Sequence, residues 1–194
     1  MESDFSFVED TVDQFFSERS AVKLAFNEGG SVVNEQVGLH GAIGTAQALL
    51  LLDLPVPNTL TTGANAGLLL DVDAAVVVGN IAMAGELDFY SFMGQAGDLI
   101  YIEVMSDSLN RIINSIDTEV SVFDSLGMLV DYYGVDAVND DEYETFDSIF
   151  LDLVLPSDGT YFIQVGASPF VASDTGNYEL FIHEFATAAP VPEP

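Results

Sequence analysis

The chain has 194 residues and carries 32 acidic side chains against three basic ones, Arg19, Lys23 and Arg111, for a formal net charge of −29. Such a polyanion has almost nothing with which to neutralise phosphates, so nucleic acids and anionic membrane surfaces are excluded as partners. The absence of cysteine excludes disulfides and cysteine metal sites. A hydrophobic content of 49% excludes disorder of the whole chain.

Residues 1–32 form an N-terminal extension with two local patterns. The apolar residues Val8, Val12 and Phe15 recur at the spacing of a helix. In the segment Ala21–Phe26, larger apolar residues alternate with smaller or polar ones, as in a strand. A short helix followed by one strand is therefore expected here.

Residues 33–185 show the pattern of an all-β domain. Alternating or β-branched runs predict strands at Leu99–Val104, Val120–Phe123, Ile149–Leu155, Tyr161–Val165 and Tyr178–Ile182. Turn residues such as glycine, aspartate and serine separate these runs. Short strands alternating with turns predict an antiparallel β-sandwich.

Two details of this domain can be predicted more closely. Ile149, Leu151, Leu153 and Tyr161 are expected to point into the core, because they alternate with residues of the opposite face. Residues 130–148 are predicted to be a long acidic connection, of a length that usually has a function.

Residues 186–194 are small residues and prolines, which predict an extended tail without a core. No apolar stretch reaches the roughly 18–20 residues that cross a bilayer. No basic segment precedes an apolar one, so no signal peptide is found in these residues.

Four segments of the β region resemble the bacterial pre-peptidase C-terminal domain family: Gly44–Leu49, Gly79–Asp98, Val120–Gly127 and Asp147–Leu180. The likeness covers about residues 38–185. It implies a jelly-roll-like β-sandwich found beside secreted peptidases or on surface proteins, with Ca²⁺ bound in some members. Where the family often carries an acidic Glu-x-Asn-Asp cluster, residues 38–41 read Gly-Leu-His-Gly, and Asn34 and Glu35 are the nearest candidates upstream for that cluster.

The tail carries a second resemblance. Val191, Pro192, Glu193 and Pro194 are similar to the start of the PEP-CTERM sorting signal, which an exosortase processes. This resemblance implies export by a Gram-negative bacterium, removal of the signals, and a mature protein at the cell surface or in a biofilm or floc matrix.

Oxygen ligands suitable for a metal ion are densest at residues 136–144. Ca²⁺ takes six to eight oxygens from carboxylates, carbonyls and water. Asn139, Asp140 and Asp141 of this segment, together with Asp88 of the family motif, are the predicted calcium ligands. The alternative is a solvated acidic loop that binds nothing.

No pattern predicts catalysis. His40 and His183 are the only histidines, and two histidines without cysteine make a weak case for a zinc site. His183 shares a strand face with Phe181 and Phe185 and is expected to be a packed or rim histidine. The sequence contains neither a Gly-x-Ser-x-Gly motif nor a glycine-rich phosphate loop.

The predicted function is that of a non-catalytic secreted module in adhesion or in the extracellular matrix. Its expected partner is a matrix polysaccharide or protein. The alternative is a filament subunit that binds itself, with the strand Ala21–Phe26 of residues 1–32 completing the sheet of a neighbouring copy.

Overall fold

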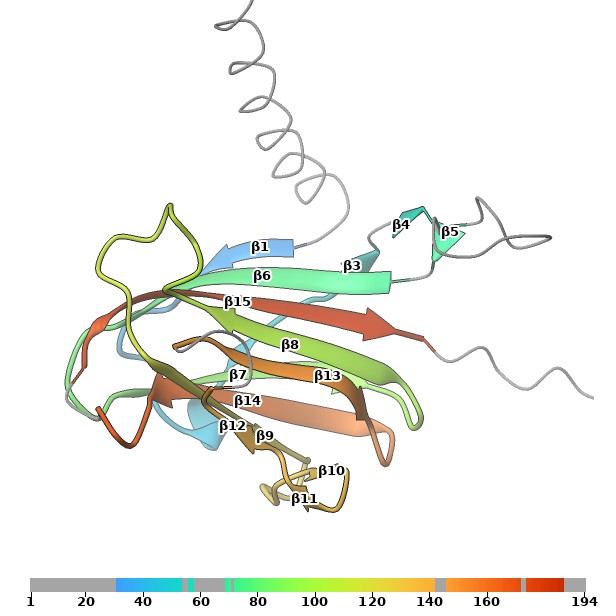
Figure 1. The fold of residues 1–194 in the computed structure, drawn as a ribbon. Coiled ribbons are helices and arrows are strands. Elements are labelled where there is room, and N and C mark those ends of the chain that lie inside the picture. The colour runs from blue at the N-terminus through green and yellow to red at the C-terminus, as the bar shows by residue number, and fades with distance from the viewer. Residues whose placement is uncertain are drawn as a thin grey trace, which may run out of the picture.

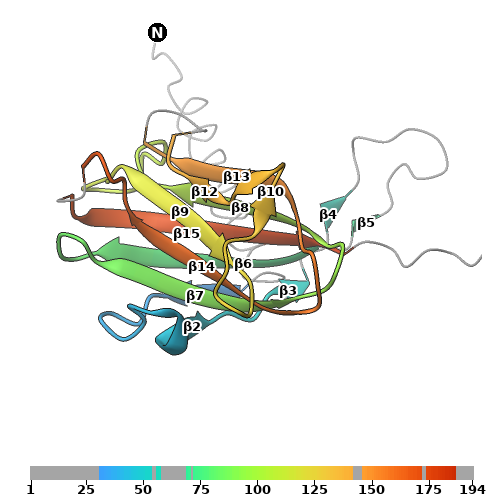
Figure 2. The same ribbon diagram turned by 90° about the horizontal axis from the view of Figure 1, so that it is seen from below.

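A computed structural model describes residues 31–53, 56–57, 69–70, 72–141, 146–171 and 174–186. Two β-sheets face each other as the layers of a sandwich (Figures 1 and 2). The strands of the first sheet are, in order, β1 (Ser31–Asn34), β6 (Val72–Ile81), β15 (Gly176–Phe185), β8 (Leu99–Met105) and β13 (Ser148–Val154), with β3 (Leu52–Asp53) also paired to β6.

The second sheet has the order β12 (Val138–Asn139), β9 (Thr118–Phe123), β14 (Gly159–Ala167), β7 (Leu87–Gly94) and β2 (Gln47–Ala48). Two short pairs lie outside these sheets, β4 (Val56–Pro57) with β5 (Leu69–Leu70) and β10 (Asp131–Tyr132) with β11 (Val135–Asp136). A short 3₁₀ turn, η1 (Ile43–Thr45), precedes β2. The all-β sandwich predicted from the sequence is confirmed, with parallel pairing of β1 to β6 and of β2 to β7 at the sheet edges.

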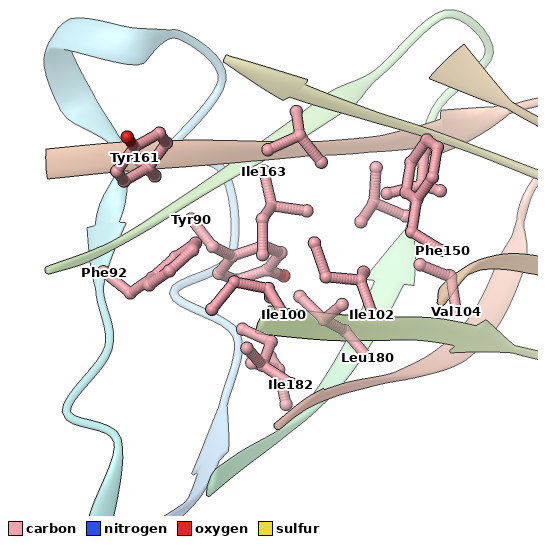
Figure 3. Packing of buried hydrophobic residues seen from close by; sticks show 14 of the residues in the cluster. Tyr90, Phe92, Ile100, Ile102, Val104, Phe150, Tyr161, Ile163, Leu180 and Ile182 are labelled. Carbon is pink, nitrogen blue, oxygen red and sulfur yellow. The ribbon is translucent and has the colours of Figure 1, made fainter. Parts of the chain in front are cut away.

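The core fills the space between the two sheets. Alternate residues of each central strand point inward, as the period of two in a β-strand requires. Figure 3 shows side chains of both sheets meeting there, including Tyr90, Phe92, Ile100, Ile102, Tyr161, Ile163, Leu180 and Ile182, all of which are buried. The five strands predicted from alternation are confirmed as β8, β9, β13, β14 and β15.

Strand β13 departs from the predicted alternation. Phe150 pairs with Ile102 and Leu153 with Ile100, so β13 carries one residue more than β8 over this stretch. The extra residue is a β-bulge, and Asp152 within it has a φ of 57°. Leu153 is buried as expected, but Ile149 is only partly buried and Leu151 is exposed.

The prediction of an inward row at Ile149, Leu151 and Leu153 is therefore wrong at its first two positions. The bulge exchanges the two faces of the strand, and Phe150 enters the core instead. The prediction for Tyr161 is confirmed, since its side chain is buried on β14.

Residues 130–141, the first part of the predicted long acidic connection, contain short strands. These are β10, β11 and β12, and Ala137 exchanges backbone hydrogen bonds with Val122 and Val130. The prediction failed because strands of two residues are too short to show a period.

Several predictions concern residues outside the described ranges. These are the helix and strand of residues 1–30, including Ala21–Phe26, and the motif Val191–Pro194. Within the described ranges, no helix has the length and apolar character needed to cross a membrane.

Candidate functional site

The predicted calcium ligands do not lie together. Asp88 on β7 pairs with Val165, Val165 with Val120, and Val120 with Asn139 on β12. Three strand spacings of about 4.8 Å each separate Asp88 from Asn139, or roughly 14 Å. One ion with ligand distances of about 2.4 Å cannot span that gap.

The ligands predicted in segment 136–144 make structural contacts instead. The Asn139 side chain accepts a hydrogen bond from the backbone N–H of Ile149 at 2.9 Å, which holds β12 beside the start of β13. The Asp140 carboxylate accepts a bond from the Ser168 hydroxyl at 3.3 Å, and Asp141 is exposed.

Asp140 and Asp141 belong to an acidic group that also contains Asp117 and Asp174. Burial, together with the nearby charges of Asp141, Asp140 and Asp174, raises the pKa of Asp117 to about 6. These carboxylates repel one another, so this end of the sandwich destabilises itself at neutral pH.

A second polar group, Glu35, His40 and Asp88, lies inside the protein beside the start of β7. Glu35 directly follows β1, His40 lies in the turn beyond it, and Asp88 is the second residue of β7. Hydrogen bonds from Phe89 N–H to the His40 carbonyl at 2.8 Å and from Glu35 N–H to the Val78 carbonyl at 3.0 Å fix this segment to β7 and β6.

The three side chains are almost wholly buried, with exposed fractions of 4% for Glu35, 1% for His40 and 3% for Asp88. His40 Nε2 lies 3.9 Å from Glu35 Oε1 and 3.8 Å from Asp88 Oδ1. We call these residues the buried triad.

Burial is the main cause of the shifted pKa values in the buried triad. It raises the pKa of Asp88 to about 7, against the lowering effect of the Tyr178 hydroxyl, and it also raises the pKa of Glu35. Burial lowers the pKa of His40, which the backbone of Phe89 partly offsets. Each group is therefore pushed towards its neutral form when the site holds nothing else.

Two tyrosines extend the triad into the core. Tyr178 on β15 donates its hydroxyl to Asp88 Oδ2 at 2.7 Å, and the hydroxyls of Tyr178 and Tyr90 lie 2.6 Å apart. The side chains of two facing sheets are thus joined by hydrogen bonds beside the triad.

A hollow of about 350 Å³ opens beside the triad. His40 and Asp88 line it together with the β6–β7 turn, where Gly85 and Glu86 lie. Glu86 caps that turn by accepting hydrogen bonds from the N–H groups of Ala82 and Met83 at 2.6 and 2.9 Å. The hollow connects the buried group to the surface through an acidic rim.

A separate hollow of about 330 Å³ lies against the β10–β11 hairpin, which Figure 1 shows projecting from the second sheet. It is lined by Asp131, Tyr132, Tyr133, Asp152, Val154 and Pro156, and we call it the aromatic hollow. The hairpin turn places Tyr133 and Gly134 at φ values of 54° and 88°, the pattern of a type I′ turn.

The two tyrosine rings of the aromatic hollow differ in how firmly their contacts hold them. Tyr132 is held by an edge contact to Phe150 and by its hydroxyl, which donates to the Leu151 carbonyl at 2.8 Å. Tyr133 packs edge-on against Tyr132 and is 78% exposed. Asp152 accepts a hydrogen bond from the Tyr101 hydroxyl through one oxygen, which leaves the other for a ligand.

Sequence reasoning found Asp88 but not its neighbours. Glu35 was named only as a distant substitute for a family residue, and His40 only as one of two histidines that make a weak case for zinc. Their juxtaposition depends on the parallel pairing of β1 with β6, which leaves no local pattern in the sequence.

No family model matches the chain, and no curated protein matches it either. The resemblance to the pre-peptidase C-terminal family and to the sorting signal therefore stays a prediction. Among solved structures, the chain is similar to a periplasmic inhibitor of g-type lysozyme from Aeromonas hydrophila, with 17% identity, a TM-score of 0.40, and coverage of 57% of this chain and 85% of that one.

Two further structures are described in the same way. The mutant inhibitor from Escherichia coli has 15% identity and a TM-score of 0.37, covering 80% of this chain and 98% of that one. The Salmonella Typhimurium inhibitor has 16% identity and a TM-score of 0.38, covering 57% and 86%.

This comparison contradicts the expected function. The three proteins are described as periplasmic inhibitors, and none as an adhesion module or a filament subunit. Both of those functions are therefore set aside.

Proposed function

We propose that this chain is a non-catalytic binding domain for a cationic protein outside the cytoplasm. The observation that carries the proposal is the aromatic hollow, where tyrosine rings and carboxylates lie around one opening. Tyrosine faces and carboxylates are the groups that attract a lysine or arginine side chain.

The geometry of the hollow suits a long cationic side chain. Tyr132 and Tyr133 come from the hairpin, Asp152 and Val154 come from β13, and Pro156 lies just beyond that strand. The apolar wall can cover the methylene stem of the partner residue, while the charged head reaches the carboxylates. The rigid Tyr132 provides a fixed wall, and the exposed Tyr133 can pack onto the bound side chain.

The charge of the whole molecule supports the same class of partner. A net charge of −29 produces a field that speeds the approach of a cationic protein and repels acidic ones. Within the described ranges, Arg111 is the only lysine or arginine, and it is paired with Glu179 at 2.5 Å. The acidic surface is therefore available to a partner's basic groups.

The proposal is tested by titrating the full chain with a g-type lysozyme and with an arginine-rich peptide, against an uncharged peptide of equal length. Asp152→Asn removes one of the two carboxylates that line the hollow, the other being Asp131, but keeps an oxygen for Tyr101, and asparagine accepts the positive φ of this position. We expect binding to either cationic probe to weaken about tenfold, or about 1.4 kcal/mol.

Asp136→Asn is the matched control, because it removes the same charge from an exposed position on the same hairpin. It should change the affinity less than twofold. Equal losses from both variants, or no binding of either cationic probe in 150 mM salt, would show that the hollow has no specific role.

A further inference from the structure

We infer that the buried triad of Glu35, His40 and Asp88 is a binding site for one divalent transition-metal ion of the zinc type. This inference does not depend on the cationic partner proposed above, since the triad and the aromatic hollow share no residue.

The ligand atoms converge on one point. His40 Nε2, Glu35 Oε1 and Asp88 Oδ1 all lie within 4.8 Å of one another, with His40 Nε2 at 3.9 and 3.8 Å from the two oxygens. Around a tetrahedral zinc ion with bonds of about 2.1 Å, ligand atoms stand about 3.4 Å apart. Binding therefore needs each carboxylate oxygen to approach His40 Nε2 by about half an ångström, and the two oxygens, which lie within 4.8 Å of each other, to close as well.

Two of these three ligand atoms have no hydrogen-bond partner. Glu35 Oε1 and both ring nitrogens of His40 are buried without a hydrogen bond. Buried polar atoms in folded proteins are nearly always satisfied, and the exceptions call for a specific cause. A metal ion between these groups would satisfy Glu35 Oε1 and His40 Nε2 together.

Each carboxylate is already oriented by its second oxygen. Glu35 Oε2 accepts a hydrogen bond from the backbone N–H of Asn80, and Asp88 Oδ2 accepts one from the Tyr178 hydroxyl. The oxygen that remains on each side points towards His40. Metal ligands are commonly held in this way by outer hydrogen bonds.

The backbone around Glu35 is fixed as well. The Gln47 side chain accepts a bond from the Gln36 N–H at 2.7 Å and donates to the Asn34 carbonyl at 3.0 Å. These two bonds bracket Glu35 and hold its position before any ion binds, so little order is lost on binding.

The charge of the site calls for a cation. Two carboxylates lie inside, Glu86 lies at the rim of the adjoining hollow, and the only lysine or arginine of the described ranges, Arg111, is engaged by Glu179. The alternative to a metal ion is a protonated His40, which would itself supply the positive charge between the two carboxylates.

The ligand set selects the kind of ion. Ca²⁺ requires six to eight oxygens, whereas one imidazole with two carboxylates suits zinc and related ions. The adjoining hollow of about 350 Å³ offers a path for entry and space for water as a fourth ligand.

The test uses the full chain, stripped with a chelator and titrated with ZnCl₂ in 150 mM salt at pH 7.5 by calorimetry. We expect one Zn²⁺ per chain, a higher melting temperature with Zn²⁺, and at least hundredfold weaker binding of CaCl₂. His40→Gln should weaken Zn²⁺ binding at least tenfold, whereas His183→Gln, the matched histidine control on β15, should stay within twofold.

Circular dichroism shows whether each variant is folded. If His40→Gln does not fold, Glu35→Gln replaces it, and X-ray absorption of the zinc-loaded wild type should show one imidazole nitrogen among oxygen ligands. The inference is overturned by the absence of Zn²⁺ binding, by tighter binding of Ca²⁺ than of Zn²⁺, by normal binding in the folded triad variant, or by a zinc spectrum without nitrogen.

Discussion

The hydroxyl of Tyr178 joins the two sheets inside the core. It comes from β15 in the first sheet and contacts Tyr90 and Asp88, both on β7 of the second. Gly79 pairs with Tyr178 across β6 and β15, and a Cβ atom at Gly79 would overlap the tyrosine ring. The ring therefore depends on this glycine to reach Asp88.

Removing this hydroxyl by Tyr178→Phe should destabilise the protein by about 1–3 kcal/mol, because Asp88 and Tyr90 each lose a buried partner. Tyr101→Phe is the matched control, since Tyr101 also donates to a carboxylate, Asp152, but at the surface. The control should cost no more than about 0.5 kcal/mol. Urea unfolding of both variants compares the two losses, and equal losses would contradict the buried role of Tyr178.

Glu184 on β15 makes stability depend on pH. Burial is the main cause that raises its pKa to about 7, and Asp98, which precedes β8, and Asp73, its partner on β6, contribute to the same rise. The folded state holds a proton that the unfolded chain releases, so this contribution is present below the ordinary glutamate pKa and is lost as pH rises through 7.

Glu184→Gln should therefore stabilise the protein at pH 8 by about 1 kcal/mol after allowance for solvent screening, and by close to nothing at pH 4.5. Melting temperatures of wild type and variant across this range measure the difference. Asp136→Asn, on the exposed strand β11, removes one charge as well and should show no comparable change with pH. A gain from Glu184→Gln that is equal at both pH values would contradict this explanation.

Strand β13 shows how one bulge decides which residues reach the core. Leu153→Ala should cost about 2–5 kcal/mol because it leaves a cavity between the sheets. Leu151→Ala, two residues away on the same strand, should cost less than about 1 kcal/mol because Leu151 is exposed. Denaturant unfolding of the two variants tests the bulge, because plain alternation would bury both leucines and predicts equal losses of stability.

The same strand marks the limit of prediction from the sequence. Alternation was sufficient on β14 and β15, where every second residue from Tyr161 to Val165 and from Tyr178 to Ile182 is buried. On β13 the pattern was equally regular, but the bulge at Asp152 leaves no periodic signal. Pairing between strands is likewise not a local property, which explains why Asp88 could be named as a metal ligand while its neighbours Glu35 and His40 could not.

At the scale of the whole molecule, repulsion between carboxylates opposes folding. Asp117, Asp140, Asp141 and Asp174 lie together at one end of the sandwich, and burial with their mutual repulsion raises the pKa of Asp117 to about 6. The net charge of −29 adds a repulsion over longer distances. Both effects weaken as mobile cations accumulate around the protein.

Salt should therefore stabilise this protein. Raising NaCl from 10 to 300 mM shortens the screening length from about 30 Å to less than about 8 Å, so repulsion between distant carboxylates largely disappears. We expect the melting temperature, measured with a chelator present throughout, to rise by about 5 °C, equivalent to roughly 1–2 kcal/mol for a domain of this size.

Choline chloride should give a similar rise, because screening does not depend on the kind of cation. Asp117→Asn should raise the melting temperature in 10 mM salt and reduce the further gain from NaCl, since part of the repulsion is already gone. A melting temperature that is independent of salt would mean that the acidic surface does not destabilise the fold, and a rise with NaCl but not with choline would point to bound sodium instead of screening.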